Sequence, residues 1–190
     1  YAACVLAGVC DQPVAGAAVY NWGRADRWNH PVNGVRWEDA RRYCEWRGRR
    51  LPTEAEWEFA TGGAGKRRFP WGDQEPDCGL AVMLDSSDGC GVGTTAPVGS
   101  CTKGAAPSGV LDLAGNVAEW TSDWYSPEGY GPWQAEDPKG PADGSTRVVR
   151  GGSFRSDPSP LRTTARERYP PGFGYGAVGF RCVASGETGR

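Results

Sequence analysis

Two carboxylates bracket a turn in the stretch GVLDLAGNVAEWTSDWY, residues 109–125. Asp112 and Glu119 are seven residues apart, and the pair Gly115-Asn116 lies between them. Carboxylates and exposed backbone carbonyls are hard oxygen ligands of the kind that Ca²⁺ prefers. The alternative is a turn in which the Asp and Asn side chains only satisfy local backbone groups. Residue types and spacing alone leave both interpretations open.

Cysteines form a second chemically distinctive set. The chain has seven, at positions 4, 10, 44, 78, 90, 101 and 182, but one histidine and no C-x-x-C pair. This composition argues against a structural zinc site. An odd number leaves at least one cysteine unpaired within the chain. The set favours disulfides, and with them an oxidising compartment, over the buried thiols of a cytosolic protein.

The stretch VVRGGSFRSDPSPLR, residues 148–162, is a third candidate. It joins a short apolar run to a Gly-Gly pair and continues with arginine, serine, aspartate and proline. It contains no Cys, His or Glu. Its residues are open to three interpretations: a reaction centre, a binding surface or only a turn.

The elements that position these residues must come from a chain of 190 residues, which suits one domain spanning 1–190. The net charge is −2 and no basic run occurs, so the electrostatic signature of a nucleic-acid binder is missing. No apolar run reaches the length of about 18 residues that a membrane span needs. The opening YAACVLAGVC is typical of the end of a helix, and we expect upstream sequence to be missing.

Two helices are predicted before residue 63. Residues 32–50 place Trp37, Ala40 and Cys44 on one face, and residues 51–63 begin with a Thr53/Glu56 capping box. Beyond them, helical periodicity disappears and short strands are expected at 109–114, 118–125, 147–154 and 177–184. Many glycines and prolines occur among nine Trp, seven Tyr and five Phe, which favours a loop-rich folded domain over disorder. The predicted class is α+β.

Five motifs in this order resemble the formylglycine-generating enzyme, or sulfatase-modifying factor, family: HPVNGVRWEDARRYCEWRGRRLPTEAEWEFATGG, FPWGD, GVLDLAGNVAEWTSDWY, RVVRGGSF and GFRC. The likeness runs from about His30 to Cys182, and RLPTEAEWE, GNVAEW and RGGS are its most specific parts. It implies a variant of the C-type lectin fold, with two helices, short antiparallel strands and much irregular loop.

The resemblance assigns roles to several residues. It implies a structural calcium site that takes two side chains and two backbone carbonyls, from Asp112, Gly115, Val117 and Glu119. A second calcium site maps near Ala81, Val82, Asp88 and Cys90, although Ala81 stands where the enzymes have an asparagine. Cys44 and Cys182 match a disulfide of the family. Local pairs Cys4–Cys10 and Cys78–Cys90 are plausible beside it and leave Cys101 free.

The resemblance also indicates that the loop at 148–162 lacks the copper-binding cysteines of the family. The founding enzymes oxidise a sulfatase cysteine to formylglycine with copper and dioxygen, and two cysteines shortly after RGGS bind the copper. The matching positions here are Ser156 and Leu161. Copper(I) needs soft thiolates, which neither side chain supplies. We therefore expect no copper centre, and the chain also lacks the histidines of a non-haem iron site.

The favoured hypothesis is a non-catalytic module that recognises a ligand or protein through residues 154–178 and the loop 126–136. Tyr, Trp and Arg are the residue types that anchor interfaces. The candidate surface consists of Arg155, Ser156, Tyr130, Trp133, Arg168, Tyr169, Phe173 and Tyr175. Arg162 and Arg166 instead resemble family scaffold positions that pair with buried acids.

Members of the family have several functions, so the resemblance leaves further functions of this chain open. The module could be a retroelement-diversified variable protein or a domain appended to a signalling or effector protein. The alternative is a formylglycine-generating oxidase. No membrane span and no nucleic acid is expected, and a secreted, periplasmic or surface location is favoured if the disulfides form.

Overall fold

The computed structural model describes residues 1–63, 66–84, 90, 93–129 and 137–184. Its α-helices are α1 (Ala2–Leu6), α2 (Trp37–Trp46) and α3 (Glu54–Ala60). Single turns of 3-10 helix occur at η1 (Ala25–Arg27), η2 (Thr102–Gly104) and η3 (Ser159–Leu161). The strands are β1 (Arg49–Arg50), β2 (Ala118–Trp124), β3 (Arg147–Arg150), β4 (Glu167–Tyr169), β5 (Val178–Phe180) and β6 (Val183–Ala184).

Both predicted helices form, and each is shorter than its predicted range. α2 begins after the extended residue Arg36, and Gly48, with a φ of 66°, follows its last turn. α3 begins after Thr53, whose hydroxyl accepts the N–H of Glu56 at 3.1 Å. The Glu56 carboxylate accepts the N–H of Thr53 at 2.9 Å, which completes the capping box.

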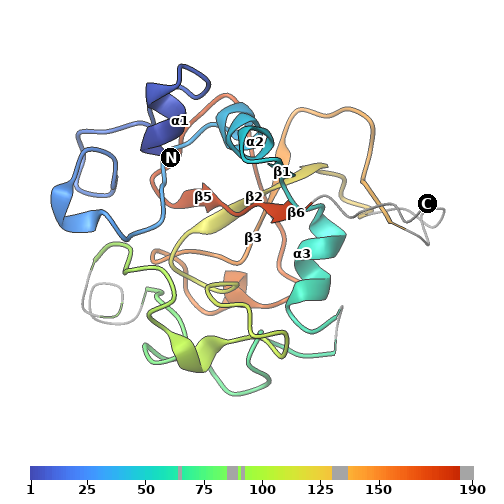
Figure 1. The fold of residues 1–190 in the computed structure, drawn as a ribbon. Helices are drawn as coiled ribbons and strands as arrows, with labels where there is room; N and C mark the ends of the chain where they lie inside the picture. The colour runs from blue at the N-terminus through green and yellow to red at the C-terminus, as the bar shows by residue number, and fades with distance from the viewer. Residues whose placement is uncertain (64–65, 85–89, 91–92, 130–136, 185–190) are drawn as a thin grey trace.

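A four-stranded sheet in the order β4-β3-β2-β5 occupies the middle of the molecule, with α2 on one side and the green loops between α3 and β2 on the other (Figure 1). β3 is antiparallel to both β2 and β4. β2 and β5 pair in parallel, with Ala118 opposite Val178. This pairing differs from the prediction, which expected antiparallel strands. A parallel pair needs a long connection, and residues 125–177 supply it. β1 and β6 form a separate antiparallel pair.

The strand predicted at 109–114 is wrong. These residues form bends and irregular backbone. Gly109 and Asp112 have φ values of 80° and 57°, and the left-handed region that they occupy is incompatible with an extended strand. The Asp112 carboxylate accepts the N–H of Gly99 at 2.6 Å, so a local hydrogen bond holds the turn.

The main hydrophobic cluster lies between α2 and the sheet. Trp37, Ala40 and Cys44 of α2 pack with Trp120 of β2 and Val149 of β3. Trp120 is fully buried, and its indole N–H donates to the Val35 carbonyl at 3.0 Å. The helical face predicted from the spacing of residues 37, 40 and 44 is therefore the face that packs.

Six of the seven cysteines form disulfides, in the pairs expected from the sequence: Cys4–Cys10, Cys44–Cys182 and Cys78–Cys90. Cys101 is the free thiol. Disulfides of this number are typical of proteins from oxidising compartments. Separately, none of the helices in the described part of the chain has the length and apolar character needed to cross a membrane.

Candidate functional site

The loop that follows β3 begins with two glycines in the left-handed region of backbone space. Gly151 has a φ of 92° and Gly152 a φ of 63°. A Cβ atom on Gly151 would lie 2.8 Å from the carbonyl oxygen of Leu113, so a side chain has no room there. The glycines therefore let the chain turn tightly, and the Gly151 carbonyl accepts the N–H of Gly115 at 2.9 Å.

A hydrogen-bonded pair of serines closes this loop. The N–H of Ser156 donates to the Ser153 carbonyl at 2.9 Å, and the Ser156 hydroxyl accepts the N–H of Ser153 at 3.0 Å. The two hydroxyl oxygens are 3.4 Å apart. Ser153 is buried and Ser156 is half-buried. The Ser156 hydroxyl thus takes part in the local structure of the loop.

Leu161 lies in the core. It is fully buried in a second hydrophobic cluster with Phe69, Ala81, Met83 and Ala114. Positions 156 and 161 consequently present a hydroxyl and a hydrocarbon, and neither group is a soft ligand for copper(I). This donor set does not fit the copper centre that the resemblance places at these two positions.

The structure divides the predicted binding surface into two groups. Arg155 and Ser156 lie in the loop after β3, where the Ser156 carbonyl accepts the N–H of Leu84 at 2.9 Å. Arg168 and Tyr169 lie on β4, and Tyr169 is opposite Arg147 at the other end of β3. The remaining members of the second group are Phe173 and Tyr175. Tyr130 and Trp133 lie outside the described residues.

Within the second group, two residues support the fold and two are free to contact a partner. The rings of Tyr169 and Tyr175 are 4.6 Å apart and both contact Trp120. Burial raises the pKa of both phenols. Phe173 is 64% exposed, and the exposed Arg168 lies 4.6 Å from the centre of the Tyr125 ring.

The stretch 112–119 brings two carboxylates close together, but one of them is already engaged. Glu119 is 4% exposed and accepts two hydrogen bonds from Arg181, each 2.6 Å long, and one from the Trp57 indole at 2.8 Å. The pKa of Asp112 is raised, chiefly by burial and further by the charge of Glu119, whereas the Gly99 N–H and Arg181 lower it. Burial thus disfavours the ionised form of Asp112, and a bound cation would stabilise that form.

The backbone of the same turn supplies oxygen atoms. Within the described residues, no hydrogen bond reaches the carbonyl of Gly115 or of Val117, both of which are buried. These carbonyls and the Asp112 carboxylate are oxygen donors of the type that Ca²⁺ prefers. Glu119 would have to share its carboxylate with Arg181. Among the described residues, no group of three or more His, Cys, Asp or Glu side chains suited to a metal ion occurs.

The region of the second predicted calcium site offers fewer ligands. Cys90 is disulfide-bonded, and its sulfur lies 3.4 Å from the carbonyl oxygen of Ala81. The Val82 carbonyl already accepts the N–H of Asn116 at 2.7 Å. Asp88, the acidic residue of this set, lies outside the described residues.

A buried charge network is the main feature that the sequence indicated only in part. Arg166 donates two hydrogen bonds to Glu54, at 2.6 and 2.8 Å, which confirms the expected pairing with a buried acid. Arg162 differs from that expectation, because it is exposed and donates to Ser159. Residue spacing does not predict the role of Arg150, which is fully buried and lies 3.5 Å from the Glu54 carboxylate.

A second missed feature is an arginine held between two indoles. The Arg147 guanidinium lies 3.7 Å from the Trp37 ring centre and 3.5 Å from that of Trp124. Burial lowers the pKa of Arg147 to about 10, although Asp123 and Glu38 oppose this shift. Because α2, β2 and β3 each contribute one of these residues, sequence spacing carries no signal for the arrangement.

Comparison with known proteins identifies the family. Residues 1–185 match the model of the sulfatase-modifying factor enzyme 1-like domain, called FGE-sulfatase. The chain belongs to this family. An FGE-sulfatase relative, the formylglycine-generating enzyme of Streptomyces coelicolor, is 42% identical over 82% of this chain and 52% of its own length. That of Thermomonospora curvata is 40% identical over 84% and 57%.

FGE-sulfatase sequences also occur in longer proteins. Serine/threonine-protein kinase pkn1 of Chlamydia caviae is 44% identical over 81% of this chain but only 24% of the kinase. The chain therefore spans about half the length of the formylglycine-generating enzymes that it matches and about a quarter of the kinase. The solved structure of PvdO from Pseudomonas aeruginosa has a TM-score of 0.73 at 24% identity, over 94% of this chain and 73% of that one.

A variable protein has the same fold. Treponema denticola variable protein 1 superposes with a TM-score of 0.66 at 24% identity, over 90% of this chain and 75% of that one. These likenesses establish the C-type-lectin-like fold of the FGE-sulfatase type, as the motifs implied.

Proposed function

We propose that this FGE-sulfatase domain recognises a ligand or protein partner and does not carry out copper-dependent oxidation. The observation that carries the proposal is the donor set at positions 156 and 161. The Ser156 hydroxyl is bound to Ser153, and the Leu161 side chain is part of a hydrophobic cluster. A chain that keeps the RGGS turn and fills the copper positions with a hydroxyl and a hydrocarbon retains a scaffold for binding.

The binding surface in this proposal lies on the segment 154–178. Its exposed members lie in the two groups described above, Arg155 in the loop after β3 and Arg168 with Phe173 on and after β4, and they offer two cations and an aromatic ring to a partner. Arginine and aromatic residues are enriched at the centres of interfaces. Tyr169 and Tyr175 hold this surface in place through their contacts with Trp120.

Two specific forms of this function are distinguishable from the gene. The kinase relative supports a domain appended to an effector, because it contains the same domain within a much longer protein. A retroelement-diversified binding protein would instead have a near-copy of its 3′ coding segment beside a reverse transcriptase gene. The full reading frame and its neighbours separate the two.

A formylglycine-generating oxidase is the second candidate, favoured by the identity of 42% to a relative with that name. The test incubates the protein with a Cys-x-Pro-x-Arg peptide and Cu(I) and measures aldehyde by mass spectrometry. We expect no aldehyde above the peptide-only background, with the Streptomyces coelicolor enzyme as the positive control. Repeated turnover by this chain would overturn the proposal.

Restoring the two thiolates tests the donor argument directly. In a Cys101→Ser background, the double variant Ser156→Cys/Leu161→Cys is expected to withdraw Cu(I) from a chromophoric chelator. Each single variant and the background protein should leave the chelator complex intact, because one or no thiolate is present at the site. Stoichiometric withdrawal by the background protein would contradict the assignment.

We also propose a structural calcium ion held by Asp112, the carbonyls of Gly115 and Val117, and Glu119. The unbonded carbonyls of the turn and the half-buried carboxyl of Asp112 beside them in sequence support it. When bound, the ion would supply charge that stabilises the turn and would perform no chemistry. Adding Ca²⁺ to protein treated with EDTA should raise the melting temperature, and Asp112→Asn should abolish that shift.

Asn tolerates the positive φ of Asp112, so this variant tests ligation with little strain. Asp143→Asn, at an exposed position, is the matched control and should keep the response to Ca²⁺. An identical melting temperature with EDTA and with Ca²⁺ would rule the ion out and leave Arg181 as the cation that stabilises Glu119.

A further inference from the structure

A cavity of about 650 Å³ lies apart from the surface proposed above. Its lining comes from the N-terminal segment, residues 21–32, α2 and the strand at Phe180, and it includes no residue of 154–178. In Figure 1 the blue N-terminal segment lies beside the red strand β5, and the rings of Tyr1 and Phe180 are 6.2 Å apart. Small-molecule sites in proteins have volumes of roughly 300–1,000 Å³, so the cavity has the size of one.

Aromatic side chains form the apolar wall of this cavity. Tyr1 stacks on Tyr43 with ring centres 5.5 Å apart, and Phe180 meets Tyr43 edge to face at 5.4 Å. Trp22 lies 6.0 Å from Tyr1, and Trp28, which also lines the cavity, is 84% exposed. A wall of this composition favours a planar aromatic ligand, because rings gain energy from stacked and edge-to-face contacts.

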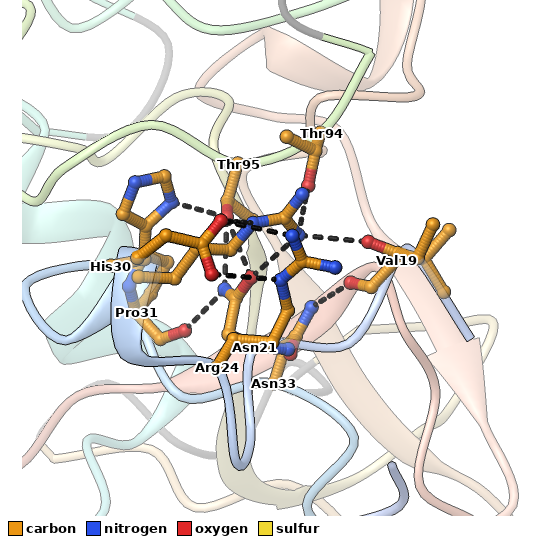
Figure 2. A network of polar contacts seen from close by, with 11 residues as sticks. Val19, Asn21, Arg24, His30, Pro31, Asn33, Thr94 and Thr95 are labelled. Atoms are coloured by element: carbon orange, nitrogen blue, oxygen red, sulfur yellow. Dashed lines mark hydrogen bonds and ion pairs between the residues drawn. The ribbon is translucent and has the colours of Figure 1, made fainter. Parts of the chain in front are cut away.

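The cavity also has a polar wall, whose residues Asn21 and His30 belong to a network of hydrogen bonds (Figure 2). The Asn21 side-chain amide donates to the Pro31 carbonyl at 2.8 Å and to the Thr95 hydroxyl at 2.9 Å. Nδ1 of His30 lies 2.9 Å from the same hydroxyl, and Asn33 and Thr95 are fully buried. This wall is therefore already formed without a ligand, which reduces the entropy lost on binding.

Arg27 lines the cavity, and its positive charge has no close carboxylate partner among the described residues. Its side chain is 12% exposed, and Nη1 donates to Ala18, Asn21 and Thr94, which are neutral acceptors. The Asp26 carboxylate is 4.0 Å from its Nε and is already bound to Arg24 at 2.9 Å. Burial lowers the pKa of Arg27, and the charge of Arg24 adds to this.

The other arginines of the lining have partners of their own. Arg24 pairs with Asp26, and Arg181 pairs with Glu119 at 2.6 Å. Among the described residues, no Asp or Glu lines the cavity. Within the described residues, Nη2 of Arg27 makes no hydrogen bond, so one edge of its guanidinium is available.

We propose that this cavity binds a small aromatic anion, with its ring against the aromatic wall and its anionic group on Arg27. A carboxylate or a similar planar anion matches the donor geometry of a guanidinium and would supply the charge that Arg27 lacks. This site is independent of the recognition surface on residues 154–178, and either one stands if the other fails.

The test compares probes that differ in one property. Indole-3-acetate carries the ring and a carboxylate, tryptamine carries the same ring and a cation, and cyclohexylacetate carries the carboxylate without an aromatic ring. Isothermal titration calorimetry should show saturable binding of indole-3-acetate with one site per chain. Tryptamine and cyclohexylacetate should bind at least about tenfold more weakly. Equal binding of tryptamine, or no saturation by indole-3-acetate, would overturn the proposal.

Two variants locate the site. Arg27→Gln should weaken indole-3-acetate binding at least about tenfold, because it removes a hydrogen bond to a charged group. Trp28→Ala tests the aromatic wall at a residue that is 84% exposed, and should weaken binding about threefold or more. Phe59→Ala, which removes a 79% exposed ring on α3, is the matched control and should bind like the original chain. Unchanged binding in both cavity variants would place the ligand elsewhere and refute the assignment.

Discussion

Asp123 on β2 is a carboxyl group whose chemistry is determined by burial. It is 2% exposed, and Oδ2 accepts the N–H of Glu54 at 2.7 Å. Its Oδ1 has no hydrogen-bond partner among the described residues. Burial is the main reason that the pKa of Asp123 is raised to about 6, and the hydrogen bond from Glu54 only partly opposes it. The folded protein therefore holds this proton more tightly than the unfolded chain does.

A specific pH dependence follows at this residue. Between the unfolded pKa of 3.8 and the folded value of about 6, the folded state binds more protons, so the contribution of Asp123 to stability falls as pH rises. Asp123→Asn removes this titration. From pH 4.5 to pH 7 the original chain should lose about 2 kcal/mol relative to the variant.

Urea unfolding of both proteins at the two pH values measures this difference. Asp157→Asn changes an exposed carboxyl and should track the original chain at both values. A constant difference between the original chain and Asp123→Asn at pH 4.5 and pH 7 would contradict the raised pKa.

At the scale of elements, Glu54 links α3 to two other parts of the chain. It lies in the first turn of α3, binds Arg166 just before β4, and lies 3.5 Å from Arg150 at the end of β3. Glu58, one turn later in α3, is 3.3 Å from Arg150. The helix is thus fixed to the sheet by charges with little access to water.

Glu54→Gln should destabilise the protein by about 3 kcal/mol, because it leaves buried guanidinium charge without its carboxylate. The surface pair of Glu45 with Arg41 on α2 gives the matched control. Glu45→Gln should cost less than about 1 kcal/mol, since exposed ion pairs contribute little. Chemical denaturation measures both, and equal costs for the two variants would show that burial does not strengthen the network.

At the scale of the whole molecule, the Cys44–Cys182 disulfide connects α2 to the chain beyond β5 across 138 residues of sequence. The Cys4–Cys10 bridge spans six. Closing a loop removes more entropy from the unfolded chain when the loop is long. The two bridges therefore contribute differently to stability although they are chemically identical.

Replacing Cys44 and Cys182 together by alanine should cost about 5 kcal/mol in the chain-entropy model. Replacing Cys4 and Cys10 together should cost about 2 kcal/mol. Differential scanning calorimetry of both double variants gives the comparison. A larger loss from the short bridge would mean that strain or packing, and not loop length, controls the contribution.

The sequence by itself determined the features that depend on neighbouring residues or on a whole motif. The α3 cap follows from Thr53 and Glu56, three residues apart, and the buried face of α2 follows from helical spacing. The family and its fold follow from the order of the motifs. The RGGS motif also marks the positions of the family's copper ligands, and the sequence has no cysteine at 156 or 161. Local hydrogen bonds and periodic burial depend on residue types at fixed spacing, so they can be predicted from the sequence.

Tertiary structure alone decided what depends on residues far apart in the chain. The cavity joins Arg27 to Tyr43 and Phe180, and the parallel pairing of β2 with β5 joins Ala118 to Val178. The positive φ of Asp112 turned a predicted strand into a turn. Burial, charge compensation and cavity shape arise from packing between distant segments, and no spacing rule encodes that packing.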